Sequence, residues 1–210
     1  MDIDETNKLG WLYNNEWLMG IVYLVFGTWI AIFGYLNFAL NMALLTMIFS
    51  IDLVCSISLS AGWMATTNGT ITSVCVGLAL GILFGCFVCN SESMNPRLFL
   101  LGTTVGFYSG AWFFAFICAC TGGKWNALWG YWLFTGLNAV MGGWRGMHRG
   151  TAIISIFTPV VGSYFFMRSW TMFFPGDYPS EAALVASQDP DRPVEMTNLY
   201  WIYFALFLVV

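Results

Sequence analysis

The chain has 210 residues, of which 59% are hydrophobic and 9% are charged, and its formal net charge is −4. A soluble domain carries about 25% charged residues, so this composition excludes an ordinary water-exposed surface. No block of lysine or arginine points to nucleic acid, and the long uncharged stretches predict an all-α integral membrane protein.

About seven transmembrane helices are expected in chain order, over 17–33, 37–59, 71–89, 97–120, 125–141, 150–170 and 199–210. The last stretch has about a dozen residues, fewer than the roughly 20 that cross a bilayer. We therefore expect that the chain continues beyond it, or that the C-terminus ends within the membrane or against a partner. The predicted organisation is an acidic N-terminal interfacial segment (1–16), a six-helix membrane domain (17–170), an acidic, proline-containing interfacial loop (171–197) and the start of a final helix (198–210).

The N-terminal segment is acidic and lacks the basic start of a signal peptide, so the first span is expected to remain in the protein. We call the N-terminal side of the membrane side A and the opposite side B. Basic residues do not orient the chain, because Lys8, Lys124, Arg168 and Arg192 fall on side A and Arg97, Arg145 and Arg149 on side B. A glycosylation sequon at Asn68, expected in a side-A loop, favours an outward N-terminus.

Glycine recurs at every fourth position in two neighbouring spans, which places each set on one helical face. Small residues let membrane helices pack closely, where lipid offers no hydrophobic driving force. The short connection between the two spans predicts a tight hairpin of spans 3 and 4. We call such a regularly spaced set of glycines a ladder, and a third ladder, spaced by seven residues, lies in the first span. We favour the interpretation that these glycines pack the helices of one chain together. Two other interpretations stay open: a glycine face that binds another protein, and a substrate path lined by glycine backbone. The ladders are Gly77, Gly81 and Gly85; Gly102, Gly106 and Gly110; and Gly20, Gly27 and Gly34.

Asp52 is the one carboxylate placed deep in an expected span, and a buried membrane charge needs a partner. Arg168, near the side-A end of the sixth span, is the candidate partner in an intramembrane ion pair. If the two charges contact each other, the pair is structural. If water separates them, they belong to an ion or proton path.

The sequence gives little indication of catalysis or metal binding. His148 lies in an expected side-B loop between Arg145 and Arg149, which favours contact with lipid headgroups over catalysis or metal binding. The six cysteines include a CxxC and a CxC at opposite membrane faces, so they are interpreted as packing residues. No catalytic motif is present, and we predict no enzyme activity, no cofactor and no metal.

Pro159 interrupts the sixth span and removes one helical hydrogen bond. With Gly162 three residues later, it predicts a helix bend. Such bends occur in transporters and in packed helices alike. The chain shows no detectable inverted repeat, which lowers the transporter interpretation.

Short motifs of one kind are found at Gly34, Tyr35, Gly162, Tyr164, Arg168, Pro175, Gly176, Tyr178 and Pro179. They resemble the multi-spanning domain shared by transmembrane protein 198 and seven-transmembrane superfamily member 3. The chain departs from this family at Ser169, where glycine is usual, and in the Pro-Gly-Asp turn. The resemblance implies a fold and a membrane setting and no catalytic chemistry.

Together these features predict a non-catalytic, multi-pass membrane protein that acts as a scaffold or accessory subunit of a larger membrane assembly. Its expected partners are the lipid bilayer and other membrane protein subunits, with no nucleic acid. The alternative is a channel or transporter for a small solute or ion that uses Asp52 and Arg168.

Overall fold

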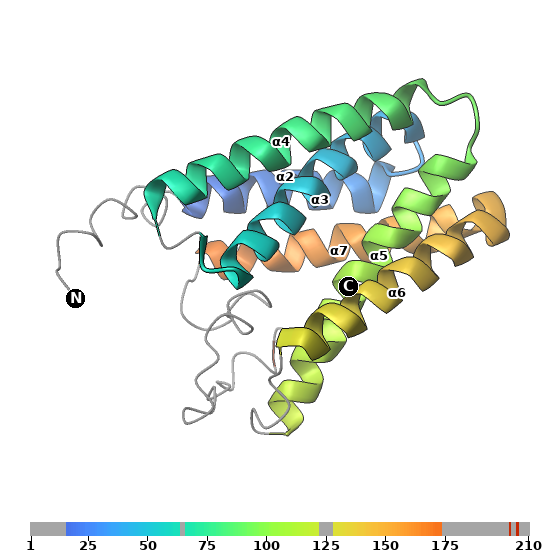
Figure 1. The fold of residues 1–210 in the computed structure, drawn as a ribbon. Helices are drawn as coiled ribbons and strands as arrows, with labels where there is room; N and C mark the ends of the chain where they lie inside the picture. Colours follow the sequence, from blue (N-terminus) through green and yellow to red (C-terminus); the bar gives the residue numbers. More distant parts are fainter. Residues whose placement is uncertain (1–15, 64–65, 122–127, 174–201, 203–204, 206–210) are drawn as a thin grey trace, which may run out of the picture.

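The computed structural model describes residues 16–63, 66–121, 128–173, 202 and 205. Between residues 16 and 173 the described part is helical, with no strand among its elements. Figure 1 shows the helices running back and forth, with three chain reversals gathered toward one end. The elements are α2 (Glu16–Phe33), α3 (Phe38–Ser60), α4 (Thr67–Asn90), α5 (Asn95–Cys120), α6 (Leu128–Arg149), the 3-10 helix η2 (Gly150–Ile153) and α7 (Ile154–Phe173).

Four stretches of the described chain are long and apolar enough to cross a membrane: Phe38–Ser60, Asn68–Asn90, Asn95–Cys118 and Leu128–Trp170. The fourth joins α6, η2 and α7, and Figure 1 shows that α7 runs back against the direction of α6. The reversal follows from Gly150, whose φ of 61° lies in the left-handed region that glycine adopts without strain.

The structure does not support the expected count of seven spans. The apolar part of α2, Gly20–Phe33, is shorter than the four long stretches. The fifth and sixth expected spans fall within the single stretch Leu128–Trp170, because α6 continues to Arg149 and η2 and α7 follow directly. Apart from residues 202 and 205, the seventh expected span, 199–210, lies outside the described residues, as does most of the 171–197 loop.

The helices associate mainly in three pairs, α2 with α7, α3 with α4, and α5 with α6. α5 also contacts α7 and α3, so it connects the pairs. In Figure 1, α5 and α6 lie side by side and cross obliquely beneath α2 and α4.

The predicted glycine hairpin of spans 3 and 4 is wrong. Added Cβ atoms at Gly77 and Gly81 of α4 would each lie 2.7 Å from a Cα of α3, at Ile51 and Met47. On α5, a Cβ at Gly106 would instead overlap the Asn138 carbonyl oxygen of α6. A ladder marks a face that accepts a close neighbour, but its spacing does not say which helix that neighbour is.

The remaining ladder glycines follow the same division. Gly85 faces Ala43 of α3, whereas Gly102 and Gly110 face Gly142 and Thr135 of α6. The third ladder, Gly20, Gly27 and Gly34, packs on α7, and Gly162 of α7 packs in return on Ala31 of α2. Each glycine face is therefore occupied by a helix of the same chain.

A single polar side chain fastens each of two short connections. Asn41, 1% exposed in α3, donates from Nδ2 to the carbonyl oxygens of Phe33, Gly34 and Leu36, and its Oδ1 accepts from Trp29 Nε1 at 3.0 Å. These bonds satisfy carbonyls at the end of α2, where the helix supplies no further donors. The turn contains Asn37 at φ 49°, a left-handed conformation that asparagine tolerates.

Arg97 does the same for the connection from α4 to α5. Its guanidinium donates to the carbonyl oxygens of Val88 at 3.1 Å, Cys89 at 3.1 Å and Ser91 at 2.7 Å. A cation at this position also complements the negative end of the α4 dipole.

Replacing Arg97 by methionine, which keeps an apolar stem, should loosen this connection. Charge-assisted hydrogen bonds are stronger than neutral ones, but the site is partly exposed, so we expect a loss of about 1–2 kcal/mol. Hydrogen exchange should quicken in residues 88–98 and little elsewhere. Arg145→Met, which removes an exposed arginine at the same end of the molecule, is the matched control. Equal exchange in the two variants would contradict the fastening role.

Candidate functional site

Asp52 of α3 is held by two tyrosine hydroxyls from two other helices. Tyr23 of α2 donates to Oδ1 at 2.7 Å, and Tyr108 of α5 donates to Oδ2 at 2.6 Å. Each carboxylate oxygen thus accepts one short, charge-assisted hydrogen bond. Because the three residues come from three helices, the carboxylate joins all three helix pairs at one point.

α7 brings two more polar residues to this point. Tyr164 stacks on Tyr108 with ring centroids 4.4 Å apart, and Arg168 is buried and within electrostatic range of Tyr23. Asp52 acts on the same tyrosine. We call Asp52, Tyr23, Tyr108, Tyr164 and Arg168 the Asp52 cluster.

The structure therefore brings the two charges predicted from the sequence, Asp52 and Arg168, within electrostatic range of the same tyrosine, Tyr23. A direct ion pair between them stays a prediction. Opposite charges in a medium of low dielectric attract strongly, which offsets part of the cost of burying each of them.

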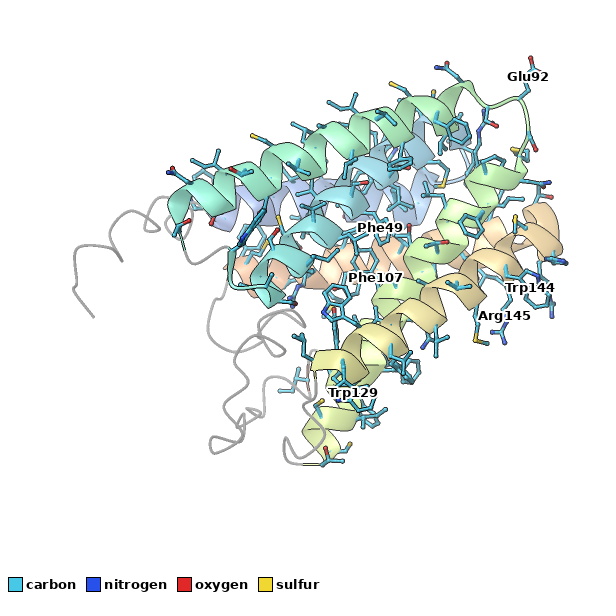
Figure 2. The ribbon with its side chains drawn as sticks, viewed as in Figure 1. Phe49, Glu92, Phe107, Trp129, Trp144 and Arg145 are labelled. Carbon is cyan, nitrogen blue, oxygen red and sulfur yellow. The ribbon has the colours of Figure 1, made fainter. Side chains whose placement is uncertain are left out.

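Aromatic rings pack around the cluster. Phe165 of α7 is fully buried and contacts the rings of Tyr23 and Tyr108, each at a centroid distance of 5.3 Å. Phe49 of α3 meets Phe107 of α5 edge to face at 5.3 Å, and Figure 2 shows these two side chains between their helices.

The cluster is enclosed toward side B and more open toward side A. One turn and more toward side B, Phe49, Leu45 and Met42 of α3 are at most 8% exposed. By contrast, residues 51–56, which include Asp52 and Cys55, are all only partly buried. Residues 51–56 of α3 are therefore less tightly enclosed than Phe49, Leu45 and Met42.

Other predicted residues lie away from the cluster. Pro159 is exposed within α7, which is recorded as one continuous helix, and Gly162 packs against α2; the predicted bend itself stays a prediction. Asn68 lies in the first turn of α4, not in a loop as expected, and Thr66 caps that helix by accepting from the Gly69 amide at 3.1 Å.

His148 is likewise helical, where a loop was expected. It lies in the last turn of α6, and its Nδ1 is 2.9 Å from the Trp144 carbonyl oxygen. The six cysteines are free thiols, and the described residues contain no group of three or more potential metal ligands.

Sequence reasoning missed Tyr23, Tyr108 and Phe165. A buried tyrosine hydroxyl needs a hydrogen-bond partner, and both tyrosines lie inside expected spans. Tyr23 also lies about two turns from the side-A end of α2, the same depth as Asp52 in α3. A comparison of their distances from the side-A helix ends would have paired Tyr23 with Asp52. No neighbouring residue in the sequence distinguishes Tyr108 from the other aromatic residues of its span.

Comparisons with protein-family models, with curated proteins and with solved structures found no match to this chain. The resemblance to the domain of transmembrane protein 198 and seven-transmembrane superfamily member 3 therefore stays a prediction. Of its matching positions, Tyr164 and Arg168 belong to the Asp52 cluster, and Gly34 and Gly162 lie in the contact between α2 and α7. Positions 175–179 lie outside the described residues.

Proposed function

We propose that this chain is a non-catalytic, multi-pass membrane protein that serves as a scaffold or accessory subunit of a larger membrane assembly. In this proposal α2, α6 and α7 cross the membrane along with α3, α4 and α5. The N-terminus then lies on side A, and the three short connections lie on side B.

The observation that carries the proposal is that side chains of two other helices hold Asp52. Each of its oxygens accepts a tyrosine hydroxyl, at 2.7 and 2.6 Å. On α3 toward side B, the large apolar side chains Phe49, Leu45 and Met42 are buried. A carboxylate held in this way joins helices, which supports a structural role over a through-path for ions.

The outer faces of the bundle are consistent with such a role. α4 packs chiefly on α3, and α6 chiefly on α5, so that each presents a long apolar face outward. With the faces of the three glycine ladders occupied internally, contacts to other subunits would use large side chains. On α6 these are Trp129, Leu133, Leu137, Val140 and Trp144.

Native mass spectrometry of the protein, extracted gently from its own membrane, tests this function. A constant mass of additional subunits in fixed stoichiometry is the expected result. Extraction with a harsher detergent should release the chain and provides the control for non-specific adducts. If the gentle extract gives only the mass of the single chain or of a homo-oligomer, the accessory role is overturned.

A channel or transporter is the second candidate, favoured by the partial exposure of Asp52 and Cys55 toward side A. It predicts that purified protein in liposomes conducts an ion or solute, and that Asp52→Asn abolishes this flux while the protein still assembles. The structural proposal predicts no flux that depends on Asp52. Tyr35→Phe, at an exposed tyrosine in the turn between α2 and α3, serves as the control substitution.

A further inference from the structure

The side-B end of α6 carries a surface of basic and aromatic side chains. Figure 2 shows Trp144 and Arg145 near this end, projecting away from the other helices. The surface comprises the exposed residues Trp144, Arg145, Met147, His148 and Arg149. Three of the five are basic.

The opposite face of α6 fixes this orientation. A Cβ at Gly142 or Gly146 would overlap the carbonyl oxygen of Gly102 or Leu98 in α5. A Cβ at Gly143 would lie 2.7 Å from the ring of Phe99. Because α6 cannot rotate without such overlaps, its basic residues stay on the outside.

Arg145 and Arg149 are four residues apart, which places two like charges side by side on the helix. Within the part of the chain that the structure describes, neither has a hydrogen bond or an ion pair, whereas Arg97 at the same end is bonded to three carbonyls. Like charges at this spacing repel each other, and a bound anion removes that repulsion.

The described acidic residues do not supply that anion. They are Glu16 at the opposite end of the molecule, Asp52 inside it, and Glu92 in the connection from α4 to α5. Figure 2 shows Glu92 beyond the end of α4, away from Arg145.

We propose that Arg145 and Arg149 bind the phosphate of an anionic phospholipid headgroup on side B. Guanidinium groups recognise phosphate oxygens through paired hydrogen bonds. Trp144 stands beside them, at the end of an apolar helix, where tryptophan contacts the interface of a bilayer. The ring of His148 contacts that of Trp144, with ring centroids 4.6 Å apart and the planes tilted by 48°. A lipid fits this surface better than a soluble anion because Trp144 and Met147 need an apolar neighbour.

Titration with phosphatidylserine and phosphatidylcholine, followed by native mass spectrometry of the full chain in detergent, tests the site. An arginine near an anionic surface adds about fivefold in affinity, so two arginines predict about a 25-fold preference for phosphatidylserine. Arg145→Gln/Arg149→Gln should lose this preference. Arg145→Lys/Arg149→Lys should keep most of it. Added inorganic phosphate should not displace the lipid.

Two controls keep the result interpretable. Trp129→Ala, at the other end of α6, should leave the preference for phosphatidylserine unchanged. The glutamine variant should unfold at the wild-type temperature in phosphatidylcholine, because both arginines are exposed. Equal affinity of the wild type for the two lipids, wild-type binding by the glutamine variant, or displacement by inorganic phosphate would overturn the proposal.

Discussion

Gly106→Leu is expected to separate α5 from α6. A Cβ at this position would overlap the Asn138 carbonyl oxygen and would lie 2.9 Å from the Cα of Ala139. Both are backbone atoms that cannot turn aside, so the helices must move apart along their whole contact. Overpacking costs about 1–3 kcal/mol for a few added methylenes, and a leucine against backbone should reach the upper end of that range. Thermal unfolding in detergent should show a large fall in midpoint.

Gly106→Ala and Gly136→Ala form the matched pair for this prediction. An alanine at Gly136 of α6 meets no atom within 4 Å, whereas an alanine at Gly106 meets backbone. Both substitutions gain helix propensity, by about 1 kcal/mol relative to glycine. Gly136→Ala should therefore keep or raise the unfolding midpoint, and Gly106→Ala should lower it. Equal midpoints would show that close approach of the α5 and α6 backbones is not required.

Asp52→Leu is expected to destabilise the bundle by about 2–3 kcal/mol, at the lower end of the range for breaking a buried charged contact because Asp52 is partly exposed. The change leaves the hydroxyls of Tyr23 and Tyr108 without their acceptor, and it removes a negative charge from the surroundings of Arg168. The loss should appear as a lower midpoint of thermal unfolding. It should affect all three helix pairs together, because the cluster joins them.

A double-mutant cycle isolates the contribution of the hydrogen bond. Tyr23→Phe and Asp52→Asn should be coupled by about 1 kcal/mol, since side-chain hydrogen bonds in membrane proteins average below that value and charged ones exceed the average. Tyr35→Phe, at a tyrosine that is 65% exposed, should show no coupling to Asp52→Asn. Additive effects of Tyr23→Phe and Asp52→Asn would contradict a cooperative Asp52 cluster.

The helical class and most helix positions followed from hydropathy, because an uncharged run of about 20 residues has few alternatives to a membrane helix. The boundaries around α6 did not. Arg145, His148 and Arg149 look like a loop because they are polar, yet a helix at a membrane surface tolerates long basic side chains in its last turn.

Glycine spacing predicted close packing but assigned the wrong neighbours. Gly81 and Gly106 have the same sequence signature, and only the structure shows that one faces α3 and the other α6. The Asp52 cluster was half predicted. Asp52 and Arg168 could be singled out because burying a charge costs free energy. Tyr108 is one aromatic residue among many, and its role depends on the oblique crossing of α5 against α3.

The pairing of α2 with α7 has a consequence for biosynthesis. The pairs α3/α4 and α5/α6 join helices that are consecutive in the chain, so each can form as soon as its second helix emerges. α2 is made early but packs on α7, so the contact of Gly27 with α7 cannot form until four more helices have been made. Contacts of long sequence separation form late. In the topology proposed above, α2 would stay a separate helix until α7 is made, and substitutions between α2 and α7 should impair maturation more than membrane insertion.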